Sequence, residues 1–280
     1  MNVGIGLPTT TPGTTGDLLV EWARKADAGP FSTLGVLDRV AYQSFDPFMA
    51  LAAAAAVTRR VRLATMVVVA PLRNTVLLAK EAASLDALSG GRFTLGLAVG
   101  ARGEDYKVAG VDQRGRGRRL SEQLEQVRSL WEEAQIAPQR DSRPSPPLLV
   151  GGSSGEALAR MARYADGYAH GGGPPRAFAS AAAKARAAWL DAGRPGTPVL
   201  WGMAYFALGA GTAESGANYL RHYYAFTGPF AEKVAAANLT SADAVIDFLR
   251  GYRDAGCDEL ILFPTLSASD QVDQLADIVS

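Results

Sequence analysis

The chain is poor in the residues that build disulfides and metal centres. Its 280 residues include one cysteine, Cys257, and only two histidines, His170 and His222. A single thiol cannot form an internal disulfide, and this suits a reducing compartment. A zinc site built from several histidines or cysteines is excluded for the same reason. We therefore expect a protein with neither a disulfide nor a metal centre.

Net charge and long apolar runs are missing as well. Lys plus Arg and Asp plus Glu each number 28, so the formal net charge is zero. No global positive field favours nucleic acid or an anionic membrane. The longest apolar run, residues 48–57, is too short to span a bilayer, and the first residues lack the basic and apolar parts of a signal peptide. We expect a cytoplasmic protein that binds small molecules and neither nucleic acid nor membrane.

What the chain does contain is a regular alternation of strand and helix patterns. The patterns predict strands over residues 3–7, 33–37, 61–69, 93–97, 148–150, 167–169, 199–208 and 259–263. Predicted helices cover residues 17–26, 47–57, 75–88, 118–134, 156–164, 177–192, 214–237 with a break at Gly228-Pro229, 242–255 and 269–279. Residues 100–117 form a polar loop, and the Pro-rich residues 136–147 form a surface excursion or linker.

Eight strands that alternate with helices predict a parallel sheet built from βαβ units. Eight such units indicate closure into a (β/α)8 TIM barrel, with residues 1–280 as a single domain. A doubly wound open sheet is the competing interpretation.

In a barrel of this kind, catalytic groups come from the carboxyl ends of the strands and the loops that follow them. One such loop, Gly151-Gly152-Ser153-Ser154, leads from an apolar strand into a helix. Glycine lets the backbone approach an anion, and a helix N-terminus offers free N–H groups and a positive dipole end. The loop is thus a candidate phosphate site. A glycine turn followed by an ordinary serine cap explains the same residues about equally well.

Three polar residues at other strand ends are candidate catalytic groups. Asp38 and Arg39 follow the second strand directly, where they would bind a polar ligand or form a plain salt bridge. His170 follows the sixth strand and precedes three glycines, so we expect it to face the mouth of the barrel. It is a candidate acid, base or substrate contact, and a hydrogen-bonded loop histidine is the alternative.

Aromatic residues gather late in the chain. Phe206 lies near the end of the seventh strand, and the helical stretch that follows contains His222, Tyr223, Tyr224 and Phe226. These aromatics are candidates for an apolar substrate pocket or an oligomer interface, with simple helix packing as the alternative. The basic run over residues 114–119 is expected to start the long helix, and it is placed to assist a phosphate.

Three blocks of sequence together resemble the bacterial-luciferase-like flavin-dependent oxidoreductases. The first is residues 71–93, which end in Ser-Gly-Gly-Arg-Phe and are followed by Leu95-Gly96 and Val99-Gly100. The second is residues 146–154 with the continuation over 162–168, and the third is residues 254–264. The blocks span most of the chain in the order that the family shows.

The resemblance implies a TIM barrel that binds reduced FMN or the deazaflavin coenzyme F420 in its mouth. It places a supporting bulge of the third strand at Met66, Val67 and Val68, and the cofactor phosphate at Gly152, Ser153 and Ser154. The turn from Gly100 to Arg102 is expected nearby. The resemblance also implies a homodimer.

Two residues depart from the family pattern. Where many members have Asp-His after the second strand, this chain has Asp38-Arg39, and an arginine is no ordinary acid or base at neutral pH. The usual tryptophan after the fourth-strand turn is replaced by Ala101-Arg102.

These observations leave three hypotheses. The leading one is a monooxygenase that uses O2 and reduced FMN, supplied by a separate flavin reductase, on a small organic substrate. The second is an F420-dependent hydride-transfer oxidoreductase. The third is a non-catalytic flavin-binding accessory subunit, against which the intact Gly-Gly-Ser-Ser loop argues.

Overall fold

The strands of the protein close into one parallel barrel. The computed structural model describes residues 1–132, 136, 138 and 145–280. Its strands are β1 (Asn2–Gly6), β2 (Thr33–Val36), β3 (Arg62–Thr65), β4 (Val68–Val69), β5 (Phe93–Ala98), β6 (Leu148–Gly151), β7 (Gly167–Ala169), β8 (Val199–Phe206) and β9 (Glu259–Pro264). They follow the order β3-β2-β1-β9-β8-β7-β6-β5-β4, and a further pairing of β3 with β5 closes the sheet. This closure confirms the barrel and excludes the open doubly wound sheet.

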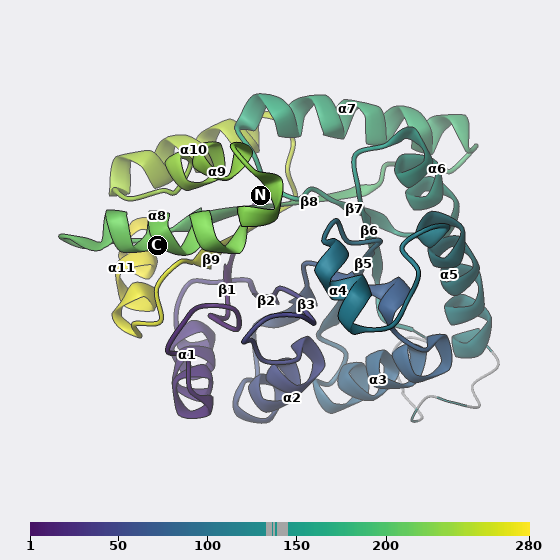
Figure 1. The fold of residues 1–280 in the computed structure, drawn as a ribbon, viewed down its shortest axis with the longest axis horizontal. Coiled ribbons are helices and arrows are strands. Elements are labelled where there is room, and N and C mark those ends of the chain that lie inside the picture. The colour runs from purple at the N-terminus through teal and green to yellow at the C-terminus, as the bar shows by residue number, and fades with distance from the viewer. Residues whose placement is uncertain (133–135, 137, 139–144) are drawn as a thin grey trace.

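An outer ring of helices covers the barrel (Figure 1). It contains α1 (Gly16–Ala28), α2 (Pro47–Val57), α3 (Thr75–Leu88), α5 (Arg116–Glu132), α6 (Gly155–Tyr164), α7 (Pro175–Asp191), α10 (Ala242–Asp254) and α11 (Asp270–Val279). Side-chain caps fix several of the starts: Thr15, Asp46 and Asn74 accept hydrogen bonds from the first-turn N–H groups of α1, α2 and α3. The bounds of α2 and α3 are those that the sequence predicts.

Three predicted elements need correction. The single strand predicted over residues 61–69 is split into β3 and β4, with a cis peptide between Met66 and Val67. The predicted loop over residues 100–117 contains a short helix, α4 (Gly103–Val108), which is too short to show a periodic pattern. The helical region 214–237 is three pieces, α8 (Thr212–Tyr223), the 3₁₀ turn η2 (Ala225–Thr227) and α9 (Phe230–Ala236). The predicted linker over residues 136–147 lies largely outside the described residues.

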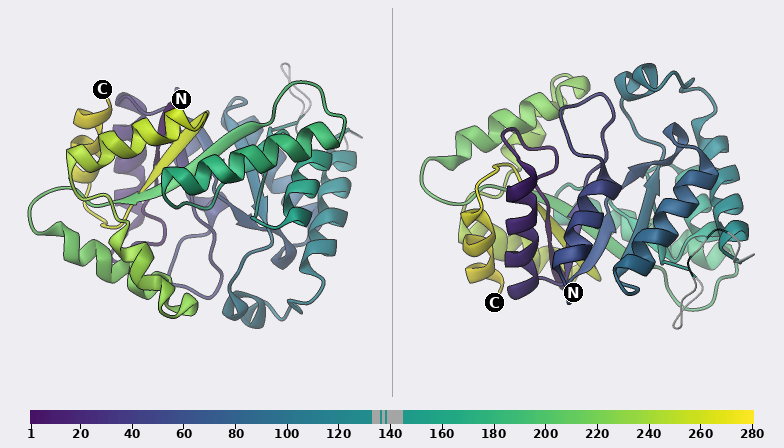
Figure 2. Two further views of the ribbon diagram at one scale, coloured as in Figure 1. Left: turned by 90° about the horizontal axis from the view of Figure 1, so that it is seen from above. Right: turned by 90° about the horizontal axis from the view of Figure 1, so that it is seen from below.

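The carboxyl ends of the strands form the mouth of the barrel. Figure 2 shows α4 and α8 at this end, together with the loops that follow β1 and β2, whereas both termini lie at the opposite end. One apolar cluster packs the strands against the outer helices, and a second fills the upper barrel and reaches the tyrosines of α8. Within the described part of the chain, no helix is long and apolar enough to cross a membrane.

Candidate functional site

Two adjoining cavities lie at the mouth, on the side of β4 to β8. The first has a volume of about 330 Å³, and the second has a volume of about 650 Å³. Both are lined by Ala98, Gly152 and Ser153, so they meet at the start of the loop after β6. Volumes of this size are typical of sites for small molecules and cofactors.

The second cavity, which we call the anion pocket, is built on the Gly-Gly-Ser-Ser loop. Ser154 caps α6, because its hydroxyl accepts a hydrogen bond from the backbone N–H of Ala157 at 3.2 Å. Gly152 has a φ of 131°, and a Cβ there would lie 2.7 Å from the Cβ of Ala157. The loop therefore requires a glycine at residue 152 and brings the backbone close to the pocket. The two interpretations of this loop are compatible, since Ser154 caps the helix while also lining the pocket.

Three arginines give the anion pocket its positive charge. Arg116 and Arg118 enter it from the first turn of α5, and Arg160 enters it from α6. Glu156 is the one acidic residue among the residues that line it, so three positive charges face one negative charge. The sequence indicated the basic run that contains Arg116 and Arg118, but it did not indicate Arg160. Arg160 lies four residues after Glu156 and therefore on the same face of α6.

The first cavity, which we call the ring cavity, has mostly apolar walls. Met66 and Val67 form one wall, and Tyr168, His170 and Met203 line other parts of it. Neither ring nitrogen of His170 makes a hydrogen bond of normal geometry with the described residues, although both are buried. Burial lowers the pKa of His170, while a backbone interaction in which the imidazole donates toward the carbonyl oxygen of Gly172 acts in the opposite direction. Because its pKa is lowered, the imidazole is neutral near pH 7, and it is a polar group in a mostly apolar cavity.

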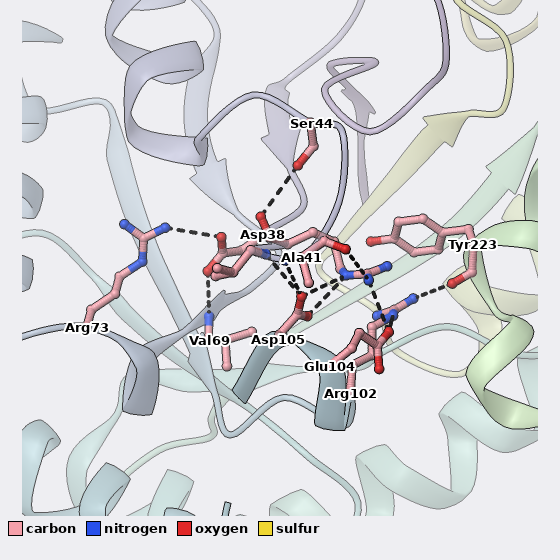
Figure 3. Close-up of polar contacts among 11 residues, drawn as sticks. Asp38, Ala41, Ser44, Val69, Arg73, Arg102, Glu104, Asp105 and Tyr223 are labelled. Atoms are coloured by element: carbon pink, nitrogen blue, oxygen red, sulfur yellow. Dashed lines mark hydrogen bonds and ion pairs between the residues drawn. The ribbon is translucent and has the colours of Figure 1, made fainter. Parts of the chain in front are cut away.

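Asp38 and Arg39 are brought near the mouth but line neither cavity. The carboxylate of Asp38 accepts the N–H of Val69 at 2.9 Å and pairs with Arg73 at 3.1 Å (Figure 3). Arg39 donates to Asp105 and to Glu104, each at 3.1 Å. Both residues therefore have partners from other loops instead of each other.

Arg102 points away from the anion pocket and into the aromatic cluster of α8. Its guanidinium donates to the backbone oxygen of Tyr223 at 2.9 Å. It also lies over the rings of Tyr223 and Phe226, at 4.3 and 4.4 Å from their centroids. This arrangement joins the β5–α4 connection to the end of α8 across the mouth.

The aromatic cluster fills the side of the mouth opposite the two cavities. Tyr223 is buried and Tyr224 is half-buried, whereas Phe226 is exposed at the rim. Burial raises the pKa values of Tyr205, Tyr219 and Tyr223, so these phenols stay neutral at physiological pH. The cluster thereby supplies neutral hydroxyl groups and an apolar wall.

Phe206 does not share this location. Its side chain is fully buried in the cluster between the barrel and the outer helices. Its neighbour Tyr205 takes the expected place, because its hydroxyl lies 2.8 Å from that of Tyr224. Successive side chains of a strand point to opposite faces, so an error of one residue reverses the direction.

The structure brings together seven of the nine residues that we expected to hold a cofactor. Five of them belong to the end of β6 and the turns after β5 and β6, and two lie between β3 and β4. These seven residues line the cavities: Met66, Val67, Gly100, Gly151, Gly152, Ser153 and Ser154. Val68 lies behind the wall in the apolar core, and Arg102 lies against α8. Among the described residues, no group of three or more acidic, histidine or cysteine side chains could hold a metal ion.

The comparison with known families agrees with this geometry. A family model described as luciferase-like monooxygenase matches residues 1–256. The chain belongs to this family. Its members are oxidoreductases, and the family resemblance of the three sequence blocks is confirmed.

Relatives with curated names cover the chain in part. An uncharacterized protein of Mycobacterium tuberculosis is 35% identical over 187 residues, which are 55% of this chain and 65% of that protein. The oxygenase component of a flavin-dependent trigonelline monooxygenase from Acinetobacter baylyi is 32% identical over 152 residues, or 48% of this chain and 42% of that protein. The chain thus spans less than two thirds of the length of either relative.

Solved structures share the fold over the whole chain. An F420-dependent secondary alcohol dehydrogenase, in complex with an F420-acetone adduct, superposes with a TM-score of 0.83 at 16% identity, covering 99% of this chain and 98% of that one. The oxygenating constituent of 3,6-diketocamphane monooxygenase from Pseudomonas putida, in complex with FMN, gives 0.72 at 17% identity, with 100% and 97% covered. These likenesses establish the fold.

Proposed function

We propose that the protein is the oxygenase component of a monooxygenase that uses reduced FMN and O2 on a small organic substrate. The observation that carries the proposal is the pair of joined cavities, one apolar and one lined by three arginines. A flavin mononucleotide has the same two parts, an apolar ring system and a phosphate. The net charge of the lining side chains, three arginines against one glutamate, complements a phosphate dianion.

The residues present fit such a cofactor. Gly152, Ser153 and Arg160 would hold the phosphate, and a side chain at residue 152 would displace this loop because its Cβ would collide with Ala157. Met66, Val67 and Met203 would enclose the ring. Reduced FMN, when bound there, supplies the electrons with which O2 is activated. We propose that a separate flavin reductase delivers it, as the name of the Acinetobacter relative, an oxygenase component, suggests by analogy.

The chain's own residues would contribute orientation, exclusion of water and one proton-handling group. The imidazole of His170 is neutral, with one nitrogen that donates and one that accepts, so it would exchange hydrogen bonds with a ligand inside the ring cavity. The tyrosines of α8 exclude water from the opposite side of the mouth. We place the substrate between the ring cavity and this cluster, against Tyr223, Tyr224 and Phe226. Assembly as a homodimer and a cytoplasmic location stay predictions.

Hydride transfer with coenzyme F420 is the second candidate. The size of the anion pocket favours it, because about 650 Å³ leaves space for a longer anionic tail beyond one phosphate. Arg39 argues against it: it stands where deazaflavin dehydrogenases of the family carry a histidine, and its guanidinium is already paired with Glu104 and Asp105. A non-catalytic accessory subunit is the third candidate, and the intact anion pocket argues against it.

A fluorescence titration with FMN and with F420 tests the proposal. We expect FMN to bind and aerobic turnover to require reduced FMN. Tight binding of F420 without binding of FMN, together with anaerobic turnover, would show that the second candidate is correct. The absence of binding by both would favour the third.

A further inference from the structure

The wall of the ring cavity is formed where the third strand of the barrel is interrupted. Strand β5 pairs with β3 through Ala64 and Thr94, and it pairs with β4 through Val68 and Leu97. Met66 and Val67 lie between the two pieces and line the ring cavity. On this side, the stretch of β5 opposite them, which includes Gly96, therefore lacks regular ladder partners, although Gly96 pairs with Leu149 of β6 on the other side. Buried backbone groups without partners are costly, so something must replace them.

The hydroxyl of Thr65 replaces the missing backbone hydrogen bonds between the two strands. It accepts a hydrogen bond from the N–H of Gly96 at 2.8 Å and donates one to the backbone oxygen of Gly96 at 2.9 Å. Thr65 is completely buried. One side chain thus satisfies both backbone groups of Gly96 and ties β5 to the last residue before the interruption.

Gly96 is required for this close approach. A Cβ at residue 96 would lie 2.2 Å from the backbone oxygen of Thr65 and 3.0 Å from Cγ1 of Val67. The first of these contacts is with backbone, which cannot swing aside as a flexible side chain would. Any larger residue would therefore push Val67 and the cavity wall away from β5.

Asp38 holds the far side of the interruption. Its carboxylate accepts the N–H of Val69 at 2.9 Å and pairs with Arg73 (Figure 3). Arg73 also pairs with Asp46 at 2.9 Å. The side chain of Asp38 is 1% exposed and lines neither cavity. Asp38 therefore contacts the wall from behind and has no access to a ligand in front of it.

We propose that Thr65, Gly96 and Asp38 are positioning residues that set the Met66–Val67 wall of the ring cavity. Through this wall they determine how tightly the protein holds a flavin ring, and they leave the anion pocket unchanged. This role also replaces the catalytic one that the sequence suggested for Asp38. The inference rests on the proposed function for its ligand, but the contacts of Thr65 with Gly96 and of Asp38 with Val69 are a property of the chain alone.

Substitutions at Thr65 test the proposal with oxidised riboflavin and FMN as probes. Thr65→Val keeps the shape of the side chain but leaves the N–H and C=O of Gly96 unpaired, whereas Thr65→Ser keeps the hydroxyl. For T65V we expect both flavins to bind at least about tenfold more weakly, which is ~1.4 kcal/mol, with an altered visible circular dichroism of the bound ring. For T65S we expect near wild-type affinities. Asp38→Asn, which can still accept from Val69 but cannot pair with Arg73 as an ion, should be intermediate.

The matched control is Thr33→Val. Thr33 is equally buried, but its hydroxyl has no hydrogen-bonding partner in the described part of the chain, and it lies at the opposite end of the barrel, at the start of β2. T33V should change neither affinity. Equal affinities in T65V and wild type, or a loss in T65V for FMN but not for riboflavin, would overturn the proposal.

Amide hydrogen exchange tests the contacts of Thr65 and Asp38 without any flavin. In T65V the amide of Gly96 should exchange at least about tenfold faster than in wild type, and in D38N the amide of Val69 should do so. The same amides should be unaffected in T33V. If the wild-type protein binds neither flavin, the proposed function fails, and the exchange rates still show whether Thr65 and Asp38 hold the backbone around the interruption. Unchanged exchange of the Gly96 amide in T65V would refute the positioning role of Thr65.

Discussion

Replacing Arg160 with methionine should separate the affinity for a phosphate from the affinity for a flavin ring. Arg160 is half-buried at the edge of the anion pocket, and its Nε donates to the hydroxyl of Ser121 at 2.9 Å. That contact orients the guanidinium and leaves its other N–H groups for an anion. Burial lowers the pKa of Arg160, but an arginine keeps its charge at neutral pH. Methionine retains much of the apolar stem and removes only the charge and the donors.

The expected magnitude follows from the lost hydrogen bond. A hydrogen bond between charged groups contributes about 1.5–3 kcal/mol, so Arg160→Met should weaken FMN binding by roughly 10- to 150-fold. Riboflavin lacks the phosphate, and its affinity should change by less than about twofold. The dependence of FMN affinity on salt concentration should also become weaker, because one charge is lost.

Arg118→Met is the matched control in the same pocket. The side chain of Arg118 is 84% exposed and lies 3.6 Å from Glu122, so solvent and its own partner screen its charge. An exposed pair of this kind contributes about 0–1 kcal/mol, and R118M should weaken FMN by at most about fivefold. Fluorescence titrations of both variants with both flavins provide the measurement. A parallel loss of riboflavin and FMN in R160M, or no loss of FMN, would refute the placement of the phosphate.

Three further predictions concern the cavities and the mouth. Gly152→Ala should cost about 1–3 kcal/mol in strain and abolish FMN binding, because residue 152 has a φ of 131°; calorimetry with FMN titration checks this, and unchanged binding would contradict it. The pKa of His170 is lowered from 6.5 in the folded state, so the unfolded chain binds more protons and the free energy of unfolding decreases as the pH is lowered below 6.5. His170→Gln should flatten this part of the stability profile in denaturant titrations at several pH values. An unaltered slope would argue against a buried neutral imidazole. Arg102→Met removes the contacts to Tyr223 and Phe226, and it should raise amide exchange over residues 219–227 while leaving riboflavin affinity unchanged; equal exchange in both proteins would show that Arg102 does not hold α8.

The sequence alone determined the order and type of nearly all barrel elements. Alternating apolar stretches, helix caps such as Asp46 and Asn74, and glycine stops are local signals, and local signals specify local structure. The same applies to the loop at Gly152, whose glycines and serines precede a helix. The family resemblance supplied the flavin, which backbone patterns do not encode.

Tertiary structure decided how distant residues meet. Arg160 joins Arg116 only because α5 and α6 pack side by side, so no spacing along the chain predicts their shared pocket. Asp38 was a candidate catalytic group at a strand end, and its partners are Val69 of β4 and Arg73 of the connection that follows β4. No sequence pattern indicated Thr65, because its hydrogen bonds to Gly96 form only when β3 and β5 lie side by side. Hydrogen bonds and ion pairs between separate elements depend on the closed barrel, and the closed barrel is what gives these residues their roles.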